Sequence, residues 1–157
     1  MFDIIHKLLD DPTFKSDVKY TTRKFKTNDI ILKQGHPHSC VYLIKKGKVH
    51  VILSAQSKKN IQVRSCIADL SKNDVFGEFG LFDDLPASAD VIAAADTDLI
   101  EIDIPSFRIF LESKPAIGYQ VFLAMLKNLV TRLQHADKSI VSLYTWGIKA
   151  PDLDEHH

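Results

Sequence analysis

The stretch with the clearest capacity for chemistry runs from Asp74 to Val91. Phe76-Gly77-Glu78 opens it with a glycine, which takes backbone conformations closed to other residues, followed by a carboxylate. A second glycine follows in the same short apolar turn, and such turns let backbone N–H groups approach an anion closely. Small residues, Ala87-Ser88-Ala89, then lead into the strand-like run Val91–Ala94. The pattern indicates a loop that binds an anionic group beside a single carboxylate.

This stretch resembles the phosphate-binding cassette of cyclic-nucleotide-binding domains, the family of the catabolite activator protein and of the regulatory subunits of cyclic-nucleotide-dependent kinases. In that family the cassette reads Phe-Gly-Glu, a short helical turn, and then Pro-Arg-x-Ala-Ser/Thr. The resemblance implies that Glu78 takes a ribose hydroxyl. It also implies that the residue after Pro86 should hold the cyclic phosphate, and that residue is Ala87. Asp90 stands at the final Ser/Thr position.

Ala87 and Asp90 decide how far the resemblance extends to a ligand. A bidentate arginine commonly compensates the charge of a phosphate. At about 1.5–3 kcal/mol per charge-assisted bond, its loss would weaken binding about a hundredfold or more. The pocket therefore has lost its ligand, takes a different one, or receives a cation from another element. Arg132 is the candidate cation, because the last helix closes over the pocket in this family; its alternative role is on a solvated helix flank.

The expected ligand-binding residues are Phe76, Gly77, Glu78, Ser88, Ala89 and Arg132. Glu78 has an alternative role, in which its carboxylate accepts hydrogen bonds from neighbouring backbone amides and only stabilises the loop. The sequence predicts no catalytic residue and no cofactor beyond a cyclic nucleotide as ligand.

Other chemistries have weaker support. His36-Pro37-His38 is similar to the His-x-His metal motif of cupins, and His50 could add a ligand, but no acid follows His38 at short range. Two exposed loop histidines are the alternative explanation. The two cysteines, Cys40 and Cys66, cannot supply the four thiolates of an iron–sulfur cluster. Since no nucleophile and base stand out either, we expect the protein not to be an enzyme.

Composition favours a cytoplasmic globular protein. The 157 residues fit one domain, with 45% apolar and 25% charged residues. Twenty basic and twenty acidic residues cancel, which argues against DNA and anionic membranes as partners. Two cysteines without close pairing suit a reducing compartment. The sequence shows no signal peptide and no apolar run of the ~18 residues that a membrane span needs.

Periodicity divides the chain into a helical segment at 1–19, a β-roll at 20–104 and helices at 105–146, followed by a polar tail at 147–157. Short alternating strands separated by turns predict the roll. The expected fold is mainly β with α: an antiparallel double-stranded β-roll, jelly-roll-like, with a short N-terminal helix and a long C-terminal dimerisation helix. Gly47 is the expected positive-φ residue of a hairpin, and Asn28 and Asn73 fall where the family often has glycine.

The long helix carries an apolar seam with spacings of four and three residues. Its members are Phe122, Leu126, Leu129, Leu133, Ala136, Ile140 and Leu143. A 3.5-residue repeat is the geometry of helices that supercoil around a partner, and it predicts a homodimer. The alternative is that the stripe packs on its own β-roll. The transcription-factor members of the family continue into a helix-turn-helix domain, for which Thr145–His157 is too short, so we expect no DNA partner.

Two functions follow from these residues. The first is a non-enzymatic regulatory module that senses a nucleotide-like ligand and relays its presence through the dimerisation helix. The second is a pseudo-receptor that binds no cyclic nucleotide and acts as a dimeric protein-interaction module, with a regulated protein partner that the sequence does not identify. The Phe76-Gly77-Glu78 turn and Ser88 favour the first function, whereas Ala87 and Asp90 favour the second.

Overall fold

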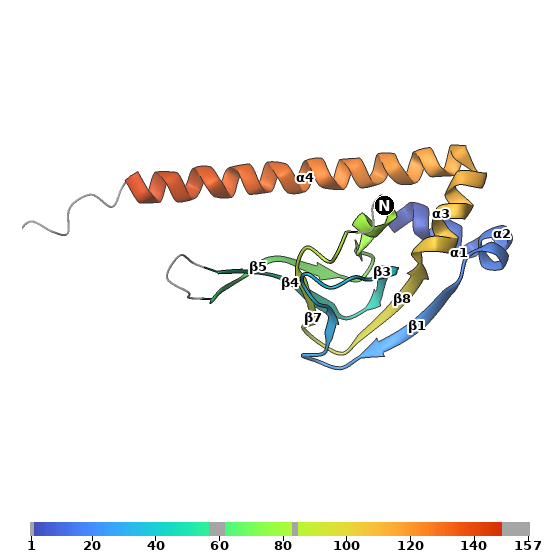
Figure 1. Cartoon of the computed structure of the whole chain (residues 1–157), viewed down its shortest axis with the longest axis horizontal. Coiled ribbons are helices and arrows are strands. Elements are labelled where there is room, and N and C mark those ends of the chain that lie inside the picture. Colours follow the sequence, from blue (N-terminus) through green and yellow to red (C-terminus); the bar gives the residue numbers. More distant parts are fainter. Residues whose placement is uncertain (1, 57–61, 83–84, 149–157) are drawn as a thin grey trace, which may run out of the picture. The chain divides into compact units, whose positions relative to one another are not determined.

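The computed structural model describes residues 2–56, 62–82 and 85–148. The chain forms two compact units, residues 1–121 and 122–157. In the described part of the first unit, antiparallel strands form two four-stranded sheets, in the orders β1-β8-β3-β6 and β2-β7-β4-β5 (Figure 1). The strands are β1 Tyr20–Phe25, β2 Ile30–Leu32, β3 Cys40–Lys46, β4 Lys48–Gln56, β5 Gln62–Ser71, β6 Val75–Phe76, β7 Asp90–Ala93 and β8 Thr97–Asp103. This architecture confirms the predicted β-roll; the assignment of the whole chain to one domain stays a prediction.

The core of the roll is built by the alternate residues of both sheets. Val49 on β4 and Ala93 on β7 are fully buried and directly paired, so these two strands share one inward face. The buried cluster that they join consists of Phe25, Leu32, Tyr42, Ile44, Val49, Phe76, Ala87, Val91, Ala93 and Leu99. Residues one position along each strand, such as His50 and Ile92, lie on the opposite face.

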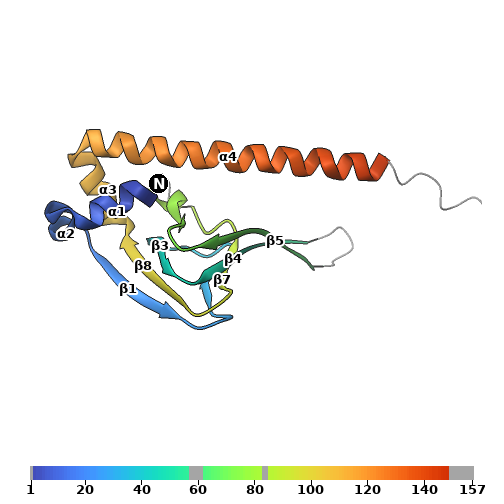
Figure 2. The same ribbon diagram turned by 180° about the vertical axis from the view of Figure 1, so that it is seen from behind.

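Three helices of this unit, α1 Phe2–Asp10, α2 Pro12–Asp17 and α3 Ile104–Ser113, lie together at one end of the roll (Figure 2). The Asp11 carboxylate caps α2 by accepting hydrogen bonds from the Thr13 and Phe14 amides, at 2.7 and 3.3 Å. Phe14 is fully buried, and its ring packs edge-on against those of Phe107 and Phe110, with centroids 5.6 and 5.2 Å away. An aromatic cluster therefore joins α2 to α3.

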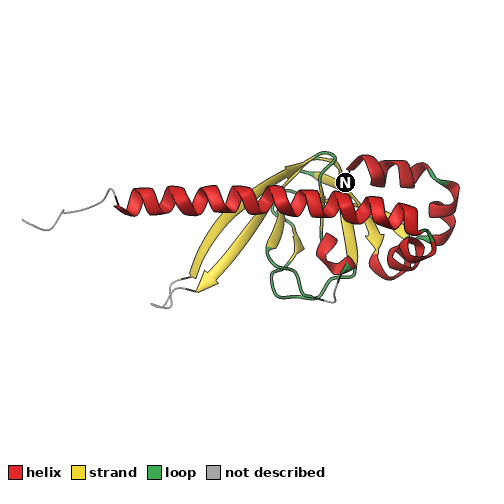
Figure 3. Cartoon of the chain, turned by 90° about the horizontal axis from the view of Figure 1, so that it is seen from above, coloured by secondary structure: helices red, strands yellow, loops and turns green. Residues whose placement is uncertain are grey.

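The long helix α4 is continuous from Pro115 to Ile148 (Figure 3). Leu126 and Leu133 of the predicted seam are 57% and 63% exposed, and Phe122 is 41% exposed. Leu129 is half-buried, and Val121 and Met125 on another side of the helix are 1% exposed. The side chains of Ala136, Ile140 and Leu143 fall outside the described residues. Among the described helices, none has a stretch both long and apolar enough to span a bilayer.

The predicted left-handed turns are confirmed. Gly47, between β3 and β4, has φ 94°, and Asn28 and Asn73 have φ 73° and 81°. Asparagine tolerates this region better than most residues, but a β-carbon at Gly47 would also meet its neighbours. It would clash with Thr97 Oγ1 and would lie 2.6 Å from the Asp96 carbonyl oxygen.

The change Gly47→Ala is therefore expected to lower the free energy of unfolding by about 3 kcal/mol or more, since it adds both backbone strain and a clash with backbone atoms. Urea unfolding measures this. Gly35→Ala is the matched control: Gly35 has φ 79°, but a β-carbon there meets nothing within 4 Å. We expect only about 1–2 kcal/mol for that change. Equal losses in the two variants would contradict the steric argument.

Candidate functional site

The glycine turn that opens the cassette is confined by the strand beside it. Gly77 has φ 73° and precedes the short 3₁₀ helix η1, Glu78–Leu81. A β-carbon on Gly77 would lie 2.9 Å from the Cys40 carbonyl oxygen and 3.0 Å from the Tyr42 ring. Only glycine fits both the backbone angle and this space. The neighbouring strand β3 is therefore the steric reason why the predicted tight turn requires a glycine.

The residues on either side of Gly77 are buried. Phe76 is 3% exposed, and its ring stacks on Tyr42 with centroids 4.9 Å apart and planes 7° from parallel. Glu78 is 4% exposed as the first residue of η1. Arg108 of α3 donates a hydrogen bond from Nη2 to the Gly80 carbonyl oxygen at 2.9 Å, which ties η1 to the helical end of the unit.

The second half of the cassette is held by backbone pairing to the loop between β2 and β3. The Ala87 amide donates to the His36 carbonyl at 2.9 Å, and the Gly35 amide donates to the Ala87 carbonyl at 2.8 Å. The Ala87 side chain, at the position where the family has arginine, is 6% exposed and belongs to the apolar core. Ala89 is 5% exposed, whereas Ser88 faces solvent.

Asp90, at the position of the family's Ser/Thr, already has two partners. Its Oδ1 accepts a hydrogen bond from the Gln34 amide at 2.8 Å, and its Oδ2 lies 3.2 Å from Nη2 of Arg64 on β5. The Asp90 side chain is 16% exposed, and that of Arg64 is 52% exposed. A carboxylate and a guanidinium of the same chain thus neutralise each other next to the cassette.

Gln34 completes this network. Its side-chain amide donates to the Ser54 carbonyl at 3.2 Å and accepts from the Ser54 amide at 2.8 Å, so the β2–β3 loop is fixed to β4. The sequence analysis assigned no role to Gln34 or Arg64, because their contacts join residues 20 to 56 positions apart and leave no local pattern. Arg132, the predicted cation, lies on α4, and its side chain falls outside the described residues.

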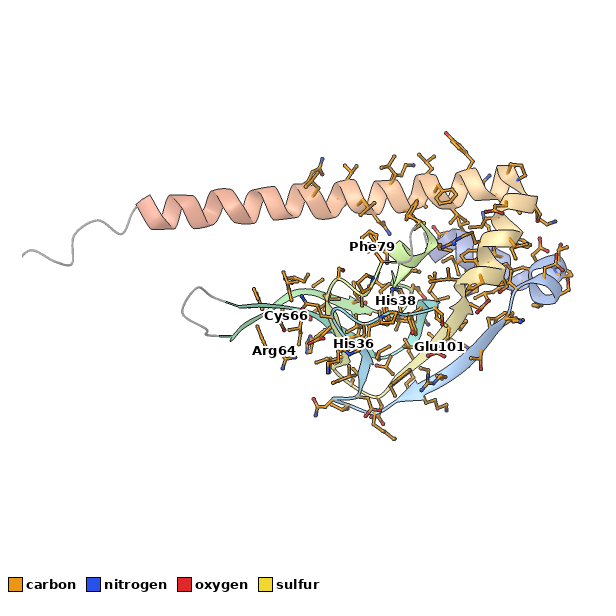
Figure 4. All side chains as sticks on the ribbon, in the orientation of Figure 1. His36, His38, Arg64, Cys66, Phe79 and Glu101 are labelled. Carbon is orange, nitrogen blue, oxygen red and sulfur yellow. The ribbon has the colours of Figure 1, made fainter. Side chains whose placement is uncertain are left out.

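His36 and His38 do not converge with His50 on a shared cation site among the described residues. His36 Nδ1 lies 3.2 Å from the Gln34 carbonyl oxygen, and His38 Nδ1 lies 3.1 Å from that of Cys40. In both contacts the ring N–H donates to the backbone. Figure 4 labels both histidines on the loop that precedes β3. Their geometry favours the alternative role as polar loop residues.

Tyr42 makes the roll sensitive to alkaline pH. Burial raises the pKa of its hydroxyl from about 10 to about 12. Because this pKa is higher in the folded than in the unfolded protein, the Tyr42 hydroxyl stabilises the folded state at pH values below its unfolded pKa. This contribution to stability is lost as the pH rises from about 10 through about 12. Tyr42→Phe keeps the ring and is expected to flatten this decline, as measured by urea unfolding across that range. The exposed Tyr119 provides the control change Tyr119→Phe; equal alkaline slopes in all three proteins would refute the assignment.

Comparison with known proteins gives this geometry a family. The model of the "Cyclic nucleotide-binding domain" family matches residues 22–114, which include strands β2 to β8, most of β1, and the cassette. A cyclic nucleotide-binding domain from Methylobacillus flagellatus KT superimposes with a TM-score of 0.71 at 22% identity, covering 90% of this chain and 83% of that one. That likeness shows the fold.

Curated relatives include a cGMP-dependent protein kinase of Plasmodium berghei, 34% identical over 130 residues, covering 82% of this chain and 14% of the relative. A cAMP-dependent protein kinase regulatory subunit of Hypocrea atroviridis is 33% identical over 87 residues, covering 55% of this chain and 17% of the relative. The chain therefore spans only a small part of these relatives. Because the family model matches more than half of the 157 residues, the chain belongs to the cyclic nucleotide-binding domain family.

Proposed function

We propose that this chain is a non-catalytic regulatory domain that does not bind cyclic nucleotides as its relatives do and acts as a homodimeric protein-interaction module. The observation that carries the proposal is the ion pair between Asp90 and Arg64 beside the cassette. Asp90 places a negative charge at the Ser/Thr position of the phosphate-binding pattern. The arginine position offers no positive charge, since Ala87 is packed in the apolar core.

Electrostatics supports this choice. A cyclic phosphate that approached the cassette would meet the Asp90 carboxylate, which is largely shielded from water at 16% exposure. Because the Arg64 guanidinium is paired with this carboxylate, the two groups together offer the phosphate no net positive charge. Arg64 offsets that charge only while it stays paired with Asp90. An arriving phosphate would have to compete for a cation that is already engaged.

The interaction role rests on α4. Its exposed seam residues, Phe122, Leu126 and Leu133, present apolar surface with the periodicity of a two-helix seam. A second copy of the chain offers the same periodicity, and an isologous pairing of the two helices would cover it. The free cysteines Cys40 and Cys66 are consistent with action in a reducing compartment, the cytoplasm.

A second candidate function has one observation in its favour. Arg64 is 52% exposed and stands beside the cassette, so it could turn from Asp90 to a ligand phosphate and replace the missing arginine. The confined Gly77 turn and the buried Glu78 would then bind the rest of a nucleotide-like ligand. In this role the domain would be a sensor that relays ligand binding through α4.

Calorimetric titration separates the two functions. We expect no saturable heat when the purified protein is titrated with cyclic AMP, cyclic GMP or a cyclic dinucleotide at micromolar concentrations. Saturable binding that disappears in the Arg64→Ala variant would overturn the proposal and establish the sensor role. Saturable binding that persists in that variant would overturn it too and would point to a cation other than Arg64.

A further inference from the structure

Three side chains with metal-binding atoms converge on the outer surface of the second sheet. They are His50 on β4 and Cys66 and Asp69 on β5, and their ligand atoms all lie within 4.8 Å of one another. None of the three belongs to the cassette. The side chains of His50 and Asp69 are 44% and 58% exposed, and Cys66 is exposed as well, so the cluster is open to solvent.

A β-bulge creates the cluster. His50 pairs with Asp69, and Val51 pairs with Ala68, but Ile52 pairs with Cys66. Ile67 is therefore an extra residue on β5, and it is 57% exposed. In a regular strand Cys66 and Asp69, three positions apart, would point to opposite faces. The extra residue brings the side chains of Cys66 and Asp69 to the same face of the sheet as His50.

The spacing of the three atoms suits a tetrahedral metal ion. Cys66 Sγ lies 3.9 Å from His50 Nδ1 and 3.6 Å from Asp69 Oδ1. Around a tetrahedral Zn²⁺, with bonds of about 2.0–2.3 Å, ligand atoms lie about 3.3–3.6 Å apart. His50 Nδ1 and Asp69 Oδ1 are 2.5 Å apart because they share a hydrogen bond. A cation between them would replace the shared proton and widen only this pair, through small side-chain rotations.

We propose that His50, Cys66 and Asp69 form a binding site for a divalent transition metal ion of the Zn²⁺ class, with water as the fourth ligand. Imidazole, thiolate and carboxylate are all Zn²⁺ ligands, and the combination of sulfur and nitrogen selects against Mg²⁺ and Ca²⁺. Thiolate and carboxylate together balance the two positive charges of the ion. Binding releases the thiol proton to the solvent, and the neutral imidazole carries its one proton on Nε2 while Nδ1 ligates the ion.

Cobalt titration of the full chain tests the site, because thiolate-bound Co²⁺ has a sulfur-to-metal charge-transfer band that carboxylate and imidazole sites lack. We expect this band to saturate at one Co²⁺ per chain and to be displaced by Zn²⁺. Cys66→Ser is expected to abolish it. Asp69→Asn and His50→Gln are each expected to weaken Co²⁺ binding by at least about tenfold.

The matched control is Cys40→Ser, which removes the other thiol of the chain, half-buried on β3. It should leave the band unchanged. Circular dichroism checks that each variant is folded, as expected for exposed positions. No band in the wild type, a band that survives Cys66→Ser, or a band lost in Cys40→Ser would each overturn the proposal. Metal held only by histidines elsewhere in the chain would give no sulfur band and so cannot imitate a positive result.

Discussion

Replacing Asp90 by serine is expected to give the protein an affinity for cyclic AMP or cyclic GMP about ten- to a hundredfold above that of the wild type. The change removes the carboxylate next to the cassette and restores the hydroxyl found at this position in the family. It also releases Arg64, whose Nη2 is 3.2 Å from Asp90 in the wild type, to pair with a phosphate. One charge-assisted hydrogen bond contributes about 1.5–3 kcal/mol, which corresponds to this gain.

Matched variants separate the contributions. Asp90→Asn removes the charge without supplying the hydroxyl, so we expect a smaller gain. Adding Arg64→Ala to Asp90→Ser should abolish the gain, since no other described residue of the network offers a cation there. Thermal unfolding must show that Asp90→Ser remains folded, because the Gln34 amide loses its acceptor. A folded Asp90→Ser variant with no gain would contradict the electrostatic account.

Ala87→Arg, the change that simply restores the family pattern, is a poorer test. Ala87 is 6% exposed and packs among apolar side chains, with its backbone fixed to the β2–β3 loop. A guanidinium there must leave the core or remain buried without a partner, and burying an unpaired charge costs several kcal/mol. A failure of Ala87→Arg to bind ligand would therefore report on packing as much as on charge.

The parts of the fold that follow local rules could be predicted from the sequence. Gly47, Asn28 and Asn73 marked left-handed turns because few other residues accept positive φ. Short alternating runs separated by turns marked the strands, and the Gly77-Glu78 turn was identified from residue type and spacing. These signals lie within a few residues of each other along the chain.

The charge network and the metal cluster could not be predicted, since both depend on strand register. Strict alternation along β5 places Cys66 and Asp69 on opposite faces, and only the extra residue Ile67 brings them together. A single extra residue in a strand has no clear signature in the amino-acid sequence. Likewise, the partners of Asp90 come from β5 and from the loop before β3, 26 and 56 residues away. The sequence therefore predicted a substitute cation at Arg132 on α4 and gave no sign of Arg64 on β5; the role of Arg132 stays a prediction.

The double change Leu126→Asp and Leu133→Asp is expected to convert the proposed homodimer into a monomer. Both side chains are more than half exposed within one chain, at 57% and 63%, and both belong to the predicted seam. Burial of a leucine contributes about 1.5–3 kcal/mol, and each change acts in both protomers. The aspartates would also face each other across the two-fold axis. The dissociation constant should rise by a hundredfold or more, as measured by sedimentation equilibrium.

Thr131→Asp is the control for that experiment. Thr131 is exposed on α4 and donates from Oγ1 to the Lys127 carbonyl of the preceding turn at 3.0 Å, and it falls outside the seam positions. It adds a charge to the same helix without touching the seam, so the dimer should persist. A wild type that is monomeric at every concentration would refute the dimer. A dimer that survives the Leu126 and Leu133 changes would move the interface away from this seam. Dissociation by Leu126→Asp and Leu133→Asp but not by Thr131→Asp would assign the exposed apolar surface of α4 to self-association.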